Sequence, residues 1–487
     1  MIETHISWVL LAGERVYKIK KPVDLGFLDF TTLEQRRHFC EEEVRLNRRL
    51  TTDVYLGVVP IGGRPPHAYM DAAGPPAEFA VMMRRLPKDR MLDELVRSGS
   101  VDPALLETLG TLVARFHEAE PTGGEIDQLA GIDTVRRNWD ENFAQTADVP
   151  SDVLRPEWRE RLQAFVTRVL ETDARRFDAR VAAGRARDCH GDLQAAHICC
   201  TTPIQIFDCI EFNHRFRYID TANEIAFLAM DLERLGRPDL AMRFLNAYIE
   251  ASGDWDAVPL LDFYRSYRAF VRGKVVSFQM ARRRRAAIEA RELFALAARY
   301  TSRRPRPRLL VMSGVMGSGK STVARALAAD IEAIVIRTDA VRKRLAGIAL
   351  TARAPDTFGG GLYTAEMGER TYAEALRLAR ELLGAGWNVI VDGSFSRAEE
   401  RDAAREVAHD AGVLFRVLAC DAPETIVVER LERRAQDAAE VSDGRLELLA
   451  EHRQRYERPA RERDVLTVDT SRDTAALVRG LRDALKA

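Results

Sequence analysis

The sequence predicts two domains, a bilobal α+β domain followed by an α/β domain with a parallel sheet. The 487-residue chain is long enough for two or three ordinary cores. A segment rich in arginine and proline covers residues 301–307, where proline stops a helix from continuing. Strand patterns precede a long helical stretch before this segment, whereas apolar runs alternate with helix-length segments after it. We therefore expect domains at residues 1–300 and 308–487, with a linker at 301–307.

Composition indicates an ordinary folded protein. Apolar residues make up 46% of the chain and charged residues 30%, and the net charge of −1 gives no overall field that attracts nucleic acid. The apolar runs are far shorter than a membrane span and no signal-peptide pattern is present, so we expect a cytoplasmic protein without a membrane partner. The six cysteines show neither zinc-ligand spacing nor a disulfide framework, so we expect reduced, mostly buried thiols.

The first domain begins with strand signals and continues with helical ones. Residues 8–20 predict a hairpin around Ala12-Gly13-Glu14, and residues 33–50 predict a charged amphipathic helix. Short strands are expected at 54–61 and 79–83, after which the chain reads as largely helical to about residue 300. A small β-rich lobe followed by a helical lobe is a bilobal plan.

The second domain alternates apolar runs with helical patterns. Such runs fit a parallel sheet that helices cover on both faces. The strands are expected at residues 309–312, 333–336, 389–391, 413–419 and 465–468.

Residues 314–322 read GVMGSGKST and fit the pattern G-x-x-x-x-G-K-S/T between an expected strand and an expected helix. Glycines let backbone N–H groups converge on an anion at the helix N-terminus, Lys320 reaches the β- and γ-phosphates, and Ser321 offers its hydroxyl to Mg²⁺. A glycine-rich turn without a ligand is the alternative. The pattern predicts an ATP or GTP site formed by Gly314, Gly317, Ser318, Gly319, Lys320, Ser321 and Thr322.

Polar residues at two strand ends indicate what this site acts on. Asp339 is expected where the second strand ends, at the edge that faces the ligand in open α/β sheets, and could orient an acceptor hydroxyl. Arg342, one helical turn later, could hold an anionic group of the acceptor. The alternative is that Asp339 only caps the helix. Asp392 ends an apolar strand and is expected near Mg²⁺.

Arginines after the fourth strand suggest a lid. Arg430 and Arg434 lie on a helix that leads into a polar segment, where they could supply charge at the transition state. Pairing of Glu429 with Arg433 within the helix is the alternative. Together these features resemble the small P-loop kinases of the polynucleotide kinase, gluconate kinase and chloramphenicol phosphotransferase group. The resemblance covers about residues 308–487 and implies phosphorylation of a hydroxyl.

The first half carries a second motif, CHGDLQAAHI at 189–198 followed by IFDCIEF at 206–212. It resembles the aminoglycoside phosphotransferase and choline-kinase branch of the protein-kinase-like fold, with the pattern H-G-D-x-x-x-x-N and then I-D. The resemblance covers roughly residues 6–295. It implies that Asp192 orients or deprotonates the acceptor hydroxyl and that Asp208 holds a metal, to which Glu211 could add a ligand.

The same resemblance implies a lysine and a helix glutamate in the small lobe. Lys18 and Lys20 are candidates on one strand face, because residues two apart in a strand point the same way, and Glu43 is the expected partner. Surface charge is the alternative for either lysine. His197 stands where the family has a metal-binding asparagine, and the usual glycine-rich cover is reduced or absent.

The whole arrangement resembles bacterial bifunctional proteins in which an aminoglycoside phosphotransferase-like domain precedes a P-loop domain. We expect an ATP- and Mg²⁺-dependent kinase with two nucleotide sites and a small-molecule hydroxyl acceptor. One alternative, which His197 motivates, is a nucleotide-gated regulator with a degenerate kinase-like half. Another is a polynucleotide 5′-hydroxyl kinase, which would rest on Asp339, Arg342 and the arginine clusters. The sequence fixes neither the acceptor nor the oligomeric state.

Overall fold

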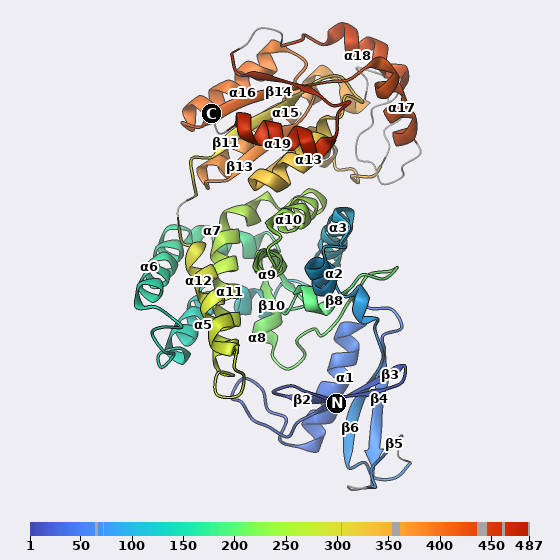
Figure 1. Cartoon of the computed structure of the whole chain (residues 1–487), viewed down its shortest axis with the longest axis vertical. Coiled ribbons are helices and arrows are strands. Elements are labelled where there is room, and N and C mark those ends of the chain that lie inside the picture. The colour runs from blue at the N-terminus through green and yellow to red at the C-terminus, as the bar shows by residue number, and fades with distance from the viewer. Residues whose placement is uncertain are drawn as a thin grey trace. The chain divides into compact units, whose positions relative to one another are not determined.

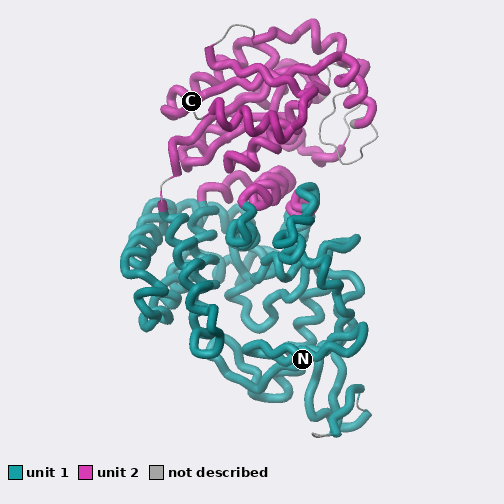
Figure 2. The backbone as a smooth tube through the Cα atoms, viewed as in Figure 1, with its two compact units in different colours: residues 1–105, 112–237, 260–301 teal, residues 106–111, 238–259, 302–487 magenta. Residues whose placement is uncertain are grey.

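The computed structural model (Figure 1) describes residues 1–63, 67–71, 73–302, 304–352, 361–435, 446–459 and 463–485. Its contacts divide the chain into two compact units (Figure 2). Unit 1 consists of residues 1–105, 112–237 and 260–301, and unit 2 of residues 106–111, 238–259 and 302–487. The longest stretch of unit 2 therefore begins inside the arginine- and proline-rich segment. Residues 238–259 of unit 2, however, come from well before it.

Unit 1 begins with an antiparallel sheet in the order β1-β2-β3-β6-β4-β5. The predicted hairpin is confirmed, with Val9 opposite Lys18, and the structure adds the short strand β1 that the sequence did not predict. Helix α1 (Leu33–Asn47) begins with a capping box of Thr32 and Gln35 and packs on the sheet through Cys40 and Val44. The strands are β1 (Ile2–Glu3), β2 (Ser7–Ala12), β3 (Arg15–Lys20), β4 (Tyr55–Gly62), β5 (Tyr69–Met70) and β6 (Glu78–Arg84).

Helices dominate the chain after this sheet, as predicted. Helix α11 packs against α12 and α9, and every residue from 221 to 232 of α9 is buried, so α9 is a core helix. Small strand pairs β7 with β10 and β8 with β9 carry the loops of the second motif. The helices are α2 (Leu92–Ser98), α3 (Pro103–Ala119), α4 (Glu125–Ala130), α5 (Ile132–Gln145), α6 (Pro156–Thr172), α7 (Ala174–Ala182), α8 (His214–Arg217), α9 (Thr221–Arg234), α10 (Pro238–Ser252), α11 (Leu261–Ser277) and α12 (Ala286–Arg299), and the strands are β7 (Ala186–Asp188), β8 (Ile198–Cys199), β9 (Gln205–Ile206) and β10 (Tyr218–Asp220).

Unit 2 holds a five-stranded parallel sheet in the order β12-β13-β11-β14-β15, so the strand before the glycine loop lies at its centre. All five predicted strands are confirmed: β11 (Arg308–Ser313), β12 (Ala333–Arg337), β13 (Asn388–Asp392), β14 (Leu414–Asp421) and β15 (Val465–Asp469). Helix α13 packs with α19, and α15 packs with α14 and α16. The helices are α13 (Lys320–Ile331), α14 (Thr338–Leu345), α15 (Ala365–Gly384), α16 (Ala398–Asp410), α17 (Glu424–Ala435), α18 (Leu449–Arg455) and α19 (Thr474–Ala484).

Helix α10 belongs to unit 2 because it covers the edge strand β12. The Asn246 amide accepts the Val335 N–H (2.8 Å) and donates to the Ala333 carbonyl (3.0 Å), which satisfies backbone groups that an edge strand would otherwise expose. Arg344 donates to the last-turn carbonyls of Glu250 (2.6 Å) and Ala251 (2.7 Å). The arginine- and proline-rich segment therefore does not mark the whole boundary of unit 2.

The mixed fold class is confirmed. All six cysteines are free and buried, as expected. In the part of the chain that the structure describes, no helix has the length and apolar character needed to span a bilayer.

Candidate active sites

The glycine loop of unit 2 connects β11 to the N-terminus of α13. Gly314, Gly317 and Gly319 all have positive φ angles, of 144°, 76° and 83°. A Cβ at position 314 would lie 2.5 Å from the Cys420 carbonyl oxygen, and one at 317 would lie 2.9 Å from Val427 Cγ1. The loop therefore needs glycine for both its backbone angles and its close packing.

Lys320 folds back over this loop. Its Nζ donates to the carbonyls of Gly314 (2.9 Å) and Val315 (2.8 Å). The hydroxyl of Ser318 is buried and has no hydrogen-bond partner among the described residues. A cation and an unsatisfied hydroxyl at a helix N-terminus are the groups that an anionic phosphate would engage.

Two oxygen donors suited to Mg²⁺ meet beside the loop. Ser321 lies near the carboxylate of Asp392, which is buried at the end of β13. Burial raises the pKa of Asp392, while the nearby charges of Arg337 and Lys320 oppose that shift. Hydroxyl and carboxylate oxygens are hard ligands, so the residues present fit a Mg²⁺ ion that also binds nucleotide phosphates.

Asp339 and Arg342 follow β12, on the first turns of α14. Arg342 Nη1 lies 2.8 Å from Asp339 Oδ1, and the guanidinium lies 4.8 Å from the centre of the Tyr363 ring. Arg337 occupies the N-cap position of α14, so Asp339 does not cap the helix. Asp339 is close enough to Asp392 to influence its pKa. The residue expected to orient the acceptor hydroxyl therefore lies near the residue expected to bind Mg²⁺.

Arg430 approaches the loop through Thr470. It donates to the hydroxyl (3.0 Å) and the carbonyl (2.7 Å) of Thr470, and the Thr470 hydroxyl donates to the Ser318 carbonyl (2.8 Å). The side chain of Arg434 and the polar segment at 436–445 lie outside the described residues. The lid thus stays a prediction.

Sequence reasoning missed His452 on α18. Its Nδ1 accepts the Met316 N–H of the glycine loop (3.2 Å), and Nε2 lies 3.3 Å from the Ser396 hydroxyl. Burial, with help from the charge of Lys320, lowers the pKa of His452 to about 4, so the ring is neutral at ordinary pH. Thr470 could have been found as a polar residue one position after β15, whereas no pattern distinguishes His452.

The second site, in unit 1, gathers five charged side chains. Lys18 Nζ lies 2.8 Å from Glu43 Oε1 and 2.6 Å from Asp208 Oδ1. Lys20 Nζ lies 2.8 Å from Glu43 Oε2 and also contacts Glu211. The structure thus brings both candidate lysines to the expected helix glutamate. Glu211, buried and held by Lys20, is a less accessible oxygen donor than Asp208, whose side chain is 41% exposed.

Side chains of α9 and α11 hold the backbone of the loop that carries Asp192. Glu224 of α9 accepts the N–H groups of His190 (2.9 Å) and Gly191 (3.1 Å), and Arg268 of α11 donates to the Gly191 carbonyl (3.0 Å). Gly191 has a φ of 85°, and a Cβ there would lie 2.8 Å from the Phe216 carbonyl oxygen. The loop therefore holds Asp192 through backbone contacts.

His197 lies between the two aspartates of the motif. Its Nδ1 is 3.0 Å from the Asp192 carbonyl oxygen and 3.4 Å from Asp192 Oδ2, and its Nε2 is 3.5 Å from Asp208 Oδ2. The charge of Lys18 holds the pKa of Asp208 below its usual range, although burial of the carboxylate acts to raise that pKa. Asp208 also has a φ of 65°, which is a strained conformation for a residue other than glycine.

Among the described residues, no three His, Cys, Asp or Glu side chains are arranged to hold a metal by themselves. A Mg²⁺ ion at either site would then complete its shell with phosphate oxygens and water. Mg²⁺ commonly binds in this way, through one or two carboxylates and the substrate phosphates.

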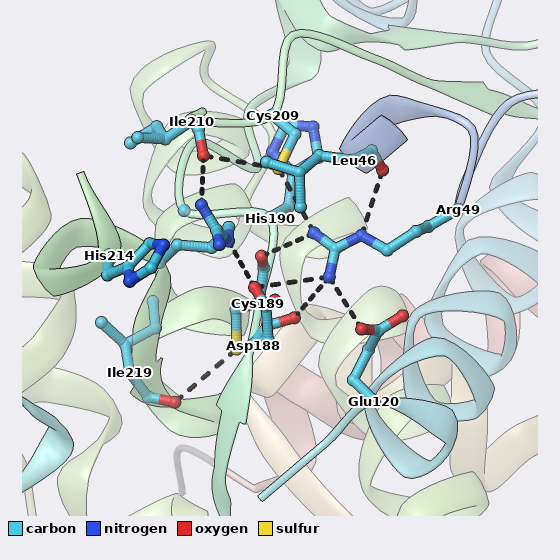
Figure 3. Close-up of polar contacts among 12 residues, drawn as sticks. Leu46, Arg49, Glu120, Asp188, Cys189, His190, Cys209, Ile210, His214 and Ile219 are labelled. Atoms are coloured by element: carbon cyan, nitrogen blue, oxygen red, sulfur yellow. Dashed lines mark hydrogen bonds and ion pairs between the residues drawn. The ribbon is translucent and has the colours of Figure 1, made fainter. Parts of the chain in front are cut away.

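Arg49, which sequence reasoning also missed, connects the end of α1 to both loops of the second site (Figure 3). It donates to Glu120 (2.7 Å), to the carbonyls of Asp188 (2.9 Å) and Cys189 (3.1 Å), and to the sulfur of Cys209 (3.4 Å). Cys189 precedes His190 and Cys209 follows Asp208 in the chain. Arg49 therefore aligns the helix that carries Glu43 with the loops that carry Asp192 and Asp208.

Two protein-family models match the chain, one in each half. The model described as "Phosphotransferase enzyme family" matches residues 40–261, and the model described as "AAA domain" matches residues 309–459. The first range includes Glu43, Asp192 and Asp208, and the second includes the glycine loop and Asp392. Residues 40–261 are thus similar to a phosphotransferase family, and residues 309–459, which carry the P-loop, are similar to an AAA domain.

Full-length relatives define the family more closely. An uncharacterised protein of Mycobacterium bovis and one of Mycobacterium tuberculosis are each 37% identical over 439 residues, which is 89% of this chain and 86% of each relative. The chain belongs to the family of these mycobacterial proteins.

Solved structures match over a single domain. A structure of the Mycobacterium tuberculosis APS kinase in complex with AMPPNP and APS is 25% identical and covers 38% of this chain and 99% of its own, with a TM-score of 0.28. A gluconokinase from Sinorhizobium meliloti is 26% identical and covers 36% of this chain and 90% of its own, with a TM-score of 0.26.

Proposed function

We propose that the protein transfers the γ-phosphate of ATP to a hydroxyl of a small molecule, with Mg²⁺, and that it has two nucleotide sites. The observation that carries the proposal is the glycine loop with Lys320 folded over it, near the buried carboxylate of Asp392. A hydroxyl, a carboxylate and an ammonium at the N-terminus of α13 make up a nucleotide–metal site, and Asp339 stands next to it.

The chain's own groups account for each step at this site. Backbone N–H groups of the glycine loop bind the phosphate oxygens, and Lys320 moves from its two carbonyl contacts to the β- and γ-phosphates. Ser321 and Asp392 would hold Mg²⁺, which would supply positive charge to offset the charge on the transferred phosphoryl group. Asp339 orients the acceptor hydroxyl and accepts its proton.

Arg342 supplies a positive charge for binding the acceptor. It stays within 2.8 Å of Asp339, so it can hold an anionic group of the acceptor while Asp339 engages the hydroxyl. An acceptor that carries both a hydroxyl and an anionic group would use both residues.

In the second site, Lys18 binds the α- and β-phosphates and Glu43 orients it. Asp208 binds the metal, and Asp192 orients the second acceptor's hydroxyl. The convergence of Lys18 on both Glu43 (2.8 Å) and Asp208 (2.6 Å) supports these roles, because the lysine is already aligned with a metal-binding oxygen.

One observation favours a regulatory role for unit 1 as the second candidate. His197 occupies the position where a second metal-binding oxygen is expected, and an imidazole is a poorer Mg²⁺ ligand than an amide oxygen. In that case unit 1 binds nucleotide without transferring phosphate.

A panel of hydroxyl compounds, read by ADP release, tests the proposal in the full chain. Wild type, Lys320→Ala and Asp192→Asn are compared, with the exposed Lys88→Ala as a control. We expect each of the first two variants to lose a different subset of the turnovers and Lys88→Ala to lose none.

The outcomes separate the candidates. If Lys320→Ala abolishes turnover of every acceptor and Asp192→Asn abolishes none, the result favours the regulatory role of unit 1. Loss of all turnover in both variants would indicate one composite site. No turnover with any hydroxyl acceptor would exclude the kinase proposal.

A further inference from the structure

Arg337 lies between two carboxylates in unit 2. It ends β12, where it is the register partner of Asp392 on β13, and its side chain is 5% exposed. Its Nη1 lies 2.8 Å from Oε1 of Glu250, and its Nε lies 3.6 Å from Oδ2 of Asp392. One guanidinium therefore contacts Asp392 on the metal side and Glu250 of α10.

The two contacts are unequal. The contact with Glu250 has hydrogen-bond length, whereas 3.6 Å from Asp392 is too long for a hydrogen bond. A guanidinium opposite a single carboxylate tends to pair with it through two parallel hydrogen bonds. Arg337 does not pair with Asp392 in this way, since the contact between the guanidinium and that carboxylate is 3.6 Å long.

Glu250 is presented by a firmly docked helix. The Asn246 amide holds α10 to the backbone of β12, and Arg344 holds the carbonyl of Glu250 itself (2.6 Å). The Glu250 side chain is 23% exposed, so solvent screens its pair with Arg337 only in part. This pair is therefore better fixed than an ion pair between two mobile surface side chains.

We propose that Glu250 is a positioning residue for the P-loop site: by holding Arg337, it keeps the Asp392 carboxylate available to Mg²⁺. The inference rests on the proposed Mg²⁺ role of Asp392. Without Glu250, Arg337 turns to Asp392 and competes with the cation for its oxygens. Glu250, which influences metal binding, then lies outside residues 302–487. It belongs to the segment 238–259, which precedes the rest of the P-loop domain in sequence but is part of unit 2.

The test measures metal binding directly. Mn²⁺ replaces Mg²⁺ as a paramagnetic probe, and its affinity is measured by electron paramagnetic resonance in the presence of a non-hydrolysable ATP analogue. All proteins are full-length and carry Asp208→Asn, so that unit 1 contributes little to the signal. We expect Glu250→Gln to weaken Mn²⁺ binding about three- to tenfold and Glu250→Asp to restore part of it.

Two controls separate positioning from stability. Asn246→Ala removes one docking contact of α10 and is expected to lower the melting temperature. Because Arg344 still holds the helix at Glu250, Mn²⁺ affinity should change little. Glu381→Gln removes an exposed pair with Arg377 and should change neither quantity. In an Arg337→Met background, Glu250→Gln should have no further effect on Mn²⁺ affinity, because its partner is gone.

The possible results are distinct. Unchanged Mn²⁺ affinity in Glu250→Gln, with or without a lower melting temperature, overturns the inference. An equal loss of affinity in Asn246→Ala and Glu250→Gln also overturns it, because the effect would then come from docking. Absence of Mn²⁺ binding in the parent protein contradicts the proposed function itself.

Discussion

Glu224 predicts a pH dependence of folding that one substitution removes. Its carboxylate is fully buried on α9 and accepts the N–H groups of His190 (2.9 Å) and Gly191 (3.1 Å). Burial raises the pKa of Glu224 to about 7, and the charge of Arg268 opposes that shift. Folding therefore favours the protonated form of this carboxyl more than the unfolded chain does.

The sign and size of the effect follow from this pKa. A carboxyl whose pKa is raised by folding contributes its full stability below its ordinary pKa of 4.5, and loses that contribution as pH rises toward about 7. At about 1.4 kcal/mol per pH unit, the free energy of unfolding falls by ~3 kcal/mol over this range. Glutamine has nearly the same shape but does not titrate, so Glu224→Gln removes this part of the pH dependence.

Thermal unfolding of the full chain from about pH 5 to about pH 8 measures this pH dependence of stability. The quantity compared is the melting temperature of unit 1 in wild type minus that in Glu224→Gln. We expect this difference to fall by roughly 5–10 °C as pH rises. The exposed Glu118→Gln serves as the control and should track wild type. A difference that stays constant or increases with pH would refute the reasoning, because the buried carboxyl would then not be protonated in the folded protein.

Gly317→Ala should destabilise unit 2 by about 2–4 kcal/mol and abolish nucleotide binding there, because its φ is +76° and a Cβ would lie 2.9 Å from Val427 Cγ1. Gly412→Ala, with φ +64° and open space around the Cβ, should cost only about 1 kcal/mol in chemical unfolding. Arg49→Met leaves buried acceptors unpaired and should cost about 3–5 kcal/mol in the same measurement, whereas the exposed Arg37→Met should cost less than about 1 kcal/mol. Equal losses within either pair would contradict these assignments.

Local patterns were sufficient to predict the main strands of both large sheets and the glycine loop, although not the short strands β1 and β5. The strands of unit 2 are continuous apolar runs because helices bury both faces of a parallel sheet. The glycine loop has a fixed spacing because its backbone needs positive φ angles at Gly314, Gly317 and Gly319. Lys18 and Lys20 share a strand face by the two-residue period, so either could reach Glu43.

The residues that adjust these sites could not be predicted in the same way. Arg49, Arg337 and Glu250 make their contacts with residues far away in sequence, and nothing in their own neighbourhood distinguishes them from surface charges. The same holds for Asn246, whose amide replaces a strand partner for β12. An arginine- and proline-rich break shows where a helix stops, but it carries no information about which earlier helix packs on the next sheet.

The number of nucleotide molecules bound per chain distinguishes one nucleotide site from two. Equilibrium dialysis of the full chain with a non-hydrolysable ATP analogue and Mg²⁺ gives the number of molecules bound per chain. We expect two molecules bound to wild type, one to Lys320→Ala and one to Lys18→Ala. A single molecule bound per wild-type chain would contradict the proposal of two nucleotide sites.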